Sequence, residues 1–205
     1  MVYLTIIVPV FNETKTIVKI LKKISNIKIK KQIIVVDDGS TDGTKKKILS
    51  QKNLVNKVIF HKSNLGKGAA IRSAQKFIRG KFVIIQDADL EYDPKDFKKL
   101  LIPLKKNYSK IVYGSRVLGK KRYKLNNFTS LSRIFFNHIL TILSNILNSQ
   151  SLTDAHTCYK VFKKQLVVKL KLKENGFSFC PEITTKFSNL NETIIEIPIS
   201  YKGRS

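Results

Sequence analysis

Apolar and polar positions alternate in two distinct ways along the first half of the chain. Residues 4–10 and 32–36 are short, nearly continuous apolar runs, the pattern of strands buried on both faces of a sheet. Between them, apolar residues recur with the spacing of one helix face, at Ile17, Val18, Leu21, Ile24 and Ile27. Asn12 precedes this segment and is of a type that caps helices, so we expect it at the N-cap.

The same alternation continues to about residue 113. We expect strands at 57–60, 82–86 and 110–113 and helices at 69–78 and 94–105, the second opened by a proline. Strands that alternate with helices predict an α/β fold with a mainly parallel sheet. Ligands of such sheets bind beyond the carboxyl ends of the strands, so the residues that follow each strand are candidates for a site.

The second half begins with a basic segment, residues 119–124, followed by an amphipathic helix at about 130–149. The apolar positions of this helix cover an arc of about 160°. They are Phe135, Phe136, Ile139, Leu140, Ile142, Leu143, Ile146 and Leu147. The helix either docks on the sheet through this face or lies in a membrane interface. The preceding basic residues favour the second interpretation, because anionic lipids attract lysine and arginine.

Composition narrows the class of partner. The net charge of +25 favours an anionic partner, although the lysines are spread along the chain as on solvated helix faces. The sequence contains no helix-turn-helix, zinc-finger or RNA-recognition pattern, so we expect no nucleic-acid partner. Cys158 and Cys180 are too few for a disulfide framework and indicate free thiols in a reducing compartment. Neither a signal peptide nor a run of about 20 apolar residues is apparent.

Two carboxylates that follow the predicted strand 82–86 are the most specific chemical signal. Asp87 and Asp89 lie two residues apart at the end of a strand, close enough to share a divalent cation. Mg²⁺ takes one or two protein carboxylates and completes its shell with water and substrate phosphates. Such a pair is a weak signal alone, so its weight depends on the residues around it.

The glycines of residues 64–69 do not have the spacing of an ATP-binding phosphate loop. They instead indicate that the backbone there permits a close approach, with Lys67 reaching toward a nucleotide. Arg72, one turn further along, is interpreted as a structural or surface cation. Gly39 follows Asp38 where the chain must turn sharply, and a helix cap is expected at Ser40 or Thr41.

These segments, taken together and in order, resemble the family 2 glycosyltransferases, and among them the polyprenyl-phosphate sugar synthases of the dolichyl-phosphate mannose and glucose type. The matching segments are residues 7–13, 35–44, 64–69, 87–91, 114–116, 132–133, 153–160 and 196–201. The resemblance covers essentially the whole chain. It implies the nucleotide-sugar-binding fold called GT-A, a transfer that inverts the anomeric carbon, and Mg²⁺ or Mn²⁺.

The resemblance also implies a donor site. Its expected residues are Pro9, Phe11, Glu13, Val36, Asp38, Lys67, Asp87, Ala88 and Asp89. Phe11 would flank a nucleobase, Glu13 would hold a ribose hydroxyl, and Asp38 would accept from a base edge or shape the turn. Asp87 and Asp89 would hold the metal with the diphosphate, and Glu91 would join them or order a metal-bound water.

The catalytic residues implied on the acceptor side are Arg116, Arg133 and Asp154, together with Asp89. Arg116 either grips a phosphate or pairs with one of the strand-end carboxylates. Arg133 is the candidate for the acceptor phosphate, and Asp154 would orient the sugar or Arg133. A lipid phosphate is largely dianionic at neutral pH and needs no strong base, whereas a sugar hydroxyl would need a carboxylate base.

The sequence therefore predicts a single GT-A domain over residues 1–205. Residues 1–116 would bind the nucleotide sugar and metal, and residues 117–205 the acceptor. The expected reaction moves a hexose from a UDP- or GDP-sugar to a polyprenyl phosphate. The alternative is transfer to a sugar hydroxyl in a surface polysaccharide. We expect a cytoplasmic protein attached peripherally to an anionic membrane surface through residues 119–147.

Overall fold

The computed structural model describes the backbone of residues 2–119 and 128–203, with side chains described except at 128–134 and 168. Its described strands form one seven-stranded sheet in the order β3-β2-β1-β4-β6-β5-β7. The strands are β1 (Leu4–Val10), β2 (Lys31–Asp37), β3 (Lys57–Phe60), β4 (Phe82–Ile85), β5 (Ile111–Ser115), β6 (Lys160–Lys163) and β7 (Ile194–Pro198).

The sheet is mainly parallel, as the sequence predicts. β1 pairs in parallel with β2 and β4, β2 with β3, and β5 with β7. β6 is the exception, because it lies between β4 and β5 and runs antiparallel to both. The start of β6 therefore lies at the same edge as the carboxyl ends of its neighbours. Segments far apart in the sequence meet at this edge.

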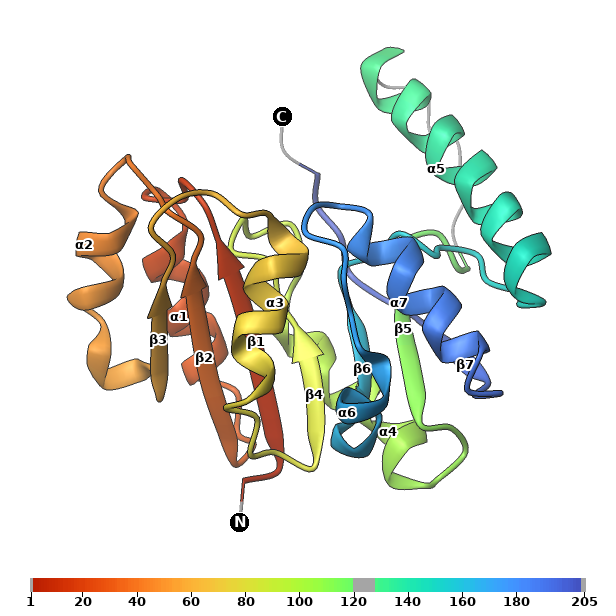
Figure 1. Cartoon of the computed structure of the whole chain (residues 1–205), viewed down its shortest axis with the longest axis horizontal. Helices are drawn as coiled ribbons and strands as arrows, with labels where there is room; N and C mark the ends of the chain where they lie inside the picture. Colours follow the sequence, from red (N-terminus) through yellow and green to blue (C-terminus); the bar gives the residue numbers. More distant parts are fainter. Residues whose placement is uncertain (1, 120–127, 204–205) are drawn as a thin grey trace.

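Helices cover both faces of the sheet, and the core lies between these layers (Figure 1). The described helices are α1 (Ile17–Ser25), α2 (Thr44–Leu49), α3 (Lys67–Gln75), α4 (Phe97–Lys105), α5 (Phe128–Asn148), α6 (Val167–Leu170) and α7 (Phe179–Ser188). Short 3₁₀ turns occur at η1 (Lys52–Leu54), η2 (Pro94–Asp96) and η3 (Lys164–Leu166). α3 and α7 pack on one face, and α1 and α4 on the other (Figure 1). None of the described helices is long and apolar enough to span a membrane.

Two predicted helix caps are wrong. Asn12 does not cap α1, which begins five residues later and is preceded by Thr16. Asn12 instead has a φ of 54°, and its side chain accepts a hydrogen bond from the amide of Thr41 at 2.9 Å. The helix after β2 begins at Thr44, beyond the expected cap at Ser40 or Thr41, and Asp42 accepts from the Thr44 amide. In both places side chains join two loops at the sheet edge.

The amphipathic helix exists as predicted, but docking of its apolar face on the sheet is wrong. α5 packs against α7 rather than on the sheet. Its inward side is polar, with Thr141, Ser144 and Asn148 buried, whereas Ile146 and Leu147 are 71% and 81% exposed. The polar side is accommodated because its amide and hydroxyl groups form hydrogen bonds inside the protein.

Candidate active site

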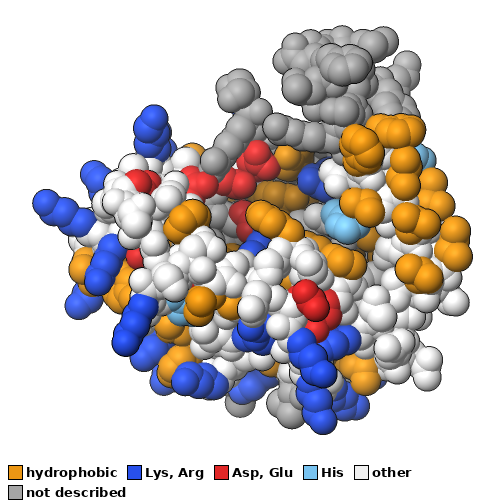
Figure 2. Space-filling view, turned by 45° about the horizontal axis from the view of Figure 1, so that its top comes forward, with side chains coloured by type: hydrophobic (Ala, Val, Ile, Leu, Met, Phe, Trp, Pro, Cys, Tyr) orange, Lys and Arg blue, Asp and Glu red, His pale blue; other side chains and the backbone are white. Residues whose placement is uncertain are grey.

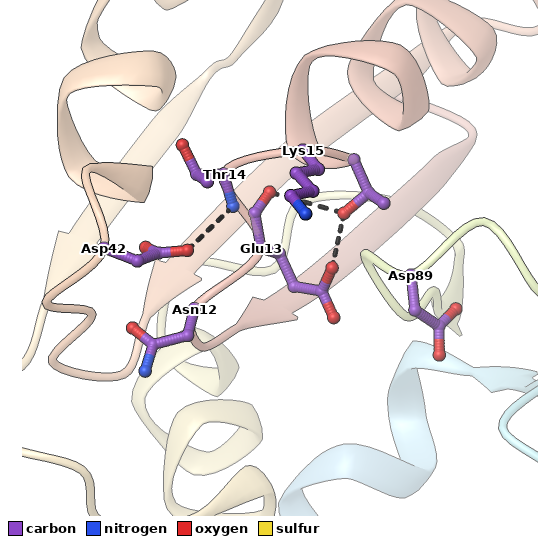
Figure 3. Close-up of a pocket in the computed structure, with 7 residues that line it drawn as sticks. Asn12, Glu13, Thr14, Lys15, Asp42 and Asp89 are labelled. Carbon is purple, nitrogen blue, oxygen red and sulfur yellow. Dashed lines mark hydrogen bonds between the residues drawn. The ribbon is translucent and has the colours of Figure 1, made fainter. Parts of the chain in front are cut away.

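A cavity of about 590 Å³ opens at the carboxyl edge of the sheet beside β1 and β4. Its lining residues are Asn12, Glu13, Thr14, Lys15, Thr16, Asp42 and Asp89. Figure 3 shows Glu13 and Asp89 reaching it from loops that follow different strands. Figure 2 shows acidic side chains gathered beside a hollow of this face, with Lys and Arg mostly at its periphery. A polar cleft has thus formed where the topology predicts one.

The turn after β4 presents the two predicted carboxylates separately. Asp87 pairs with the ammonium of Lys67, the first residue of α3, at 2.6 Å. Burial lowers the pKa of Lys67, but Asp87 outweighs this effect and raises it on balance. Asp89 accepts a hydrogen bond from the amide of Glu91 at 3.0 Å, across Leu90, whose φ is 69°. Asp89 is therefore the carboxylate that the turn directs to the cavity.

The third expected metal ligand faces elsewhere. The carboxylate of Glu91 accepts a hydrogen bond from the hydroxyl of Tyr201 at 2.8 Å. The described part of the chain contains no group of three His, Cys, Asp or Glu arranged to hold a metal. The donor chemistry nevertheless fits Mg²⁺ or Mn²⁺, because these ions need only one or two protein carboxylates when a diphosphate supplies further oxygens. Asp89 and the neighbouring Asp87 are the carboxylates that could hold such an ion.

Asp38 organises the loop that follows β3. Its carboxylate accepts hydrogen bonds from the amides of Leu65 and Gly66 at 3.0 and 2.7 Å. It also lies 2.6 Å from the Nδ1 of His61. Gly39 has a φ of 76°, and a Cβ there would collide with the Ser63 backbone, so the predicted sharp turn is confirmed. A contact between Asp38 and a nucleobase stays a prediction. In the structure its carboxylate accepts the hydrogen bonds that fix this loop.

The remaining expected donor residues differ in how they can contact a ligand. Phe11 is 44% exposed just beyond β1, as a residue that flanks a base requires. Pro9, Val36 and Ala88 are buried, so they present main chain rather than side chain. Glu13 lines the cavity, and one of its carboxylate oxygens accepts from the Thr16 hydroxyl at 2.5 Å.

The glycines at the start of α3 do allow a close backbone approach, but the partner is another part of the chain. A Cβ on Gly66 or Gly68 would collide with the backbone of residues 174–175. Arg72 reinforces this junction by donating to the carbonyls of Lys173 and Glu174 and to the side chain of Asn175. The interpretation of Arg72 as a structural cation agrees with these contacts.

Arg116 and Asp154 form a two-pronged ion pair at the end of β5. Nε and Nη2 of Arg116 each donate to a different oxygen of Asp154, both at 2.8 Å. Burial raises the pKa of Asp154, but the hydrogen bonds and charge of Arg116 lower it on balance. The guanidinium also lies 5.3 Å from the centre of the Tyr201 ring. Of the alternatives for Arg116, a salt bridge is observed, though to Asp154 rather than to a β4 carboxylate.

Two residues that support Asp154 lie in segments that carry the family resemblance but are not among the expected site residues. Glu196 of β7 accepts from the amides of Thr153 and Asp154 at 2.6 and 2.9 Å. Lys160 of β6 is fully buried, and its ammonium donates to the carbonyl of Ala155 at 2.8 Å. Through these hydrogen bonds both residues fix the loop that precedes β6. The sequence marks their segments by resemblance, but their contacts with this loop follow from the strand order, which places β6 and β7 beside β5.

Arg133 lies in α5, but its side chain is outside the described residues, so its predicted role stays a prediction. The basic residues at 120–124 also lie outside the described residues.

Comparison with a family model identifies the class of protein. The model of glycosyl transferase family 2 matches residues 5–170, so the chain belongs to this family of glycosyl-transferring enzymes (EC 2.4 class). The match begins in β1 and extends through the ion pair at Arg116 and Asp154. It thus includes both sides of the cleft.

Among curated proteins, the chain is similar to two dolichyl-phosphate β-glucosyltransferases. One, ALG5A of Trichomonas vaginalis, is 30% identical over 219 residues, covering 98% of this chain and 66% of the relative. The other, from Saccharomyces cerevisiae, is 29% identical over 223 residues, covering 98% and 67%. The chain thus spans about two thirds of the length of these relatives.

Solved structures confirm the GT-A fold. Glucosyl-3-phosphoglycerate synthase from Mycobacterium tuberculosis, in complex with Mn²⁺, UDP and glucosyl-3-phosphoglycerate, superposes with a TM-score of 0.72. The identity is 17%, over 99% of this chain and 73% of that one. At this identity the likeness establishes the fold alone.

Proposed function

We propose that the chain transfers a hexose from a UDP- or GDP-sugar to a polyprenyl phosphate, with inversion at the anomeric carbon. Similarity to dolichyl-phosphate β-glucosyltransferases over 98% of the chain supports a lipid phosphate as acceptor. The division into a donor part at 1–116 and an acceptor part at 117–205 belongs to the same proposal. It is supported by the positions of the Asp89 cavity and of the Arg116–Asp154 pair.

The preference for a lipid phosphate over a sugar hydroxyl as acceptor rests on the ion pair that Asp154 forms with Arg116. A sugar hydroxyl must lose its proton during attack, which calls for a carboxylate base within reach. Arg116 binds both oxygens of Asp154 and holds its pKa below the usual range, against the effect of burial. A carboxylate held in this way is a poor base. A lipid phosphate supplies its own anionic oxygen, so this site suits it better.

In the proposed reaction, an oxygen of the acceptor phosphate forms a bond to the anomeric carbon. The bond from that carbon to the diphosphate breaks, and the electron pair leaves with the nucleoside diphosphate. Lys67 stands beside Asp87 at the start of α3, where its charge favours the leaving diphosphate. Phe11 and Glu13 would hold the nucleoside, and Arg116, fixed by Asp154, would orient the acceptor together with Arg133.

A divalent metal held by Asp89 and Asp87 would neutralise the charge that develops on the leaving diphosphate. We place the reaction at the cytoplasmic face of a membrane, with the protein attached peripherally.

The proposal is tested by a transfer assay with purified protein, Mn²⁺ and a short polyprenyl phosphate in detergent. UDP-glucose and GDP-mannose, each labelled in the sugar, are supplied in parallel. We expect a labelled organic-soluble product from one donor and none after chelation of the metal. Release of free sugar without lipid product, or better transfer to an oligosaccharide hydroxyl than to lipid phosphate, would contradict the proposal.

A further inference from the structure

One side of α5 exposes a continuous apolar surface, here called the α5 apolar face. Each of its residues is at least 37% exposed. They are Phe135, Phe136, Ile139, Leu140, Ile142, Leu143, Ile146 and Leu147. Figure 2 shows the hydrophobic strip on the right of the molecule, over α5. Soluble surfaces rarely expose so many large apolar side chains together, and such patches mark binding sites.

The outward orientation is fixed by specific contacts on the opposite side of the helix. Asn145 exchanges two hydrogen bonds with the main chain of Leu152, at 2.8 and 2.9 Å. The hydroxyl of Ser188 in α7 donates to the carbonyl of Asn148 at 2.5 Å. Rolling the helix to bury its apolar face would break these bonds and leave buried polar groups unpaired, which is costly. The apolar face therefore belongs outside.

Charge indicates what covers this face. The helix has no Asp, Glu or Lys among its 21 residues, and the sequence just before it contains Lys120, Lys121, Arg122 and Lys124. The whole chain has a net charge of +25. An apolar strip without acidic residues, on a strongly cationic protein, complements an anionic lipid surface better than a second cationic copy of the chain.

We propose that the α5 apolar face inserts into the boundary between headgroups and acyl chains of a bilayer that contains anionic lipid. An amphipathic helix binds in this way, parallel to the membrane plane. The role of this membrane contact, to bring the protein to a lipid acceptor, rests on the proposed function. The chain leaves β5 at Arg116, passes through α5 and returns at Asp154, so the membrane contact lies within the segment that bears the acceptor-side ion pair.

The test measures flotation of the purified full chain with vesicles of phosphatidylcholine, alone or with phosphatidylglycerol. The variant Ile146→Glu/Leu147→Glu places two charges at exposed positions, 71% and 81%, where no packing is lost. Ile102→Glu/Tyr108→Glu is the matched control, with positions that are 48% and 68% exposed outside α5. We expect the α5 variant to bind anionic vesicles at least about tenfold more weakly than wild type, and the control to bind like wild type.

Equal binding of wild type and the α5 variant, or an equal loss in the control, would overturn the proposal. So would a wild-type dimer in solution that the α5 variant converts to monomer, without vesicle binding by either, because a second copy would then cover the face. A parallel assay with a water-soluble short-chain prenyl phosphate separates this inference from the proposed function. Transfer by wild type without α5-dependent binding defeats the membrane contact alone, whereas α5-dependent binding without transfer defeats the proposed function alone.

Discussion

Two ion pairs lie at the carboxyl edge of the sheet, one after β4 and one after β5. Lys67 neutralises Asp87 at the end of β4, and Arg116 neutralises Asp154 at the end of β5. Each joins a residue that follows a strand to one from a distant segment. Asp89 differs, because it lines the cavity and accepts a hydrogen bond from the amide of Glu91 within its own turn. At the scale of single residues, it is therefore the carboxylate on which metal-dependent transfer should depend most.

Asp89→Asn keeps the size of the side chain and removes its charge. Because neutralisation of the leaving diphosphate would be lost, we expect kcat to fall by about 100-fold or more. Thermal stability should stay close to that of wild type. Glu192→Gln, which changes a carboxylate paired with Lys110 outside the cavity lining, is the control and should retain activity. Steady-state kinetics across a Mn²⁺ titration provides the measurement, and near-normal turnover of Asp89→Asn would refute the assignment.

The buried Lys160 should make the stability of the protein depend on pH. Burial lowers its pKa to about 8, with Cys180 and Asp154 opposing the shift. The folded protein thus holds this proton less tightly than the unfolded chain, in which the pKa is near 10.5. Stability from this group is therefore constant below about pH 8 and rises toward pH 10, by up to about 1 kcal/mol per unit.

Lys160→Met fills similar space without a titrating group and isolates this effect. We expect the free energy of unfolding of wild type to rise relative to that of the variant between about pH 8 and 10. Urea unfolding at a series of pH values measures the difference. A difference that does not change with pH would show that Lys160 titrates as an ordinary lysine.

At the scale of elements, the junction between α3 and residues 173–175 links the two halves of the chain. Gly66 and Gly68 let the backbones meet, and Arg72 binds the carbonyls across the gap. Lys67 lies between these glycines, so the position of its ammonium depends on this junction. Under the proposed function, Arg72 should therefore influence donor binding indirectly, through the position of Lys67.

Arg72→Ala removes the donors to two carbonyls while leaving the glycine contacts in place. We expect KM for the nucleotide sugar to rise several-fold and stability to fall by about 1–2 kcal/mol. Arg72→Lys should recover part of both losses. Lys46→Ala, at an exposed position of α2, serves as the control for loss of a cation. If Arg72→Ala left KM for the nucleotide sugar unchanged, the junction would have no role in donor binding.

The elements also differ in how well the sequence predicts them. β1, β2 and β4 are nearly continuous apolar runs buried on both faces, so local pattern suffices for them. β6 is not predicted, because it contains Lys160, whose buried ammonium is compensated by groups outside the strand, the Tyr113 ring and the Ala155 carbonyl among them. α5 is predicted as a helix, but the direction of its apolar face depends on tertiary hydrogen bonds. The sequence likewise names candidate site residues at the strand ends, but it does not reveal which of them pair, such as Arg116 with Asp154.

For the whole molecule, the dominant property is the excess of positive charge. With 39 Lys and Arg against 14 Asp and Glu, most cations have no carboxylate to pair with. Figure 2 shows acidic side chains beside the hollow of one face and blue side chains around it. Mutual repulsion should destabilise the compact state at low ionic strength, since the Debye length is then long.

Added salt is therefore expected to stabilise the protein. We predict that Tm rises by several degrees between about 0.02 and 0.3 M NaCl, because screening weakens repulsion among the lysines more than it weakens the few ion pairs. Differential scanning calorimetry at fixed pH measures the shift. A fall in Tm over this range would mean that ion pairs outweigh repulsion.

The antiparallel placement of β6 has a consequence for how such an enzyme can diversify. β5 ends and β6 begins side by side at the carboxyl edge of the sheet, so the two ends of the connection between them, after Ser115 and before Lys160, lie close together. A connection with such close ends can vary in length without separating β5 from β6, provided that the mostly buried segment 152–159 keeps its contacts with the end of β4. Under the proposed function, exchange of this connection between relatives is expected to alter the choice of acceptor while the preceding residues keep the same nucleotide sugar.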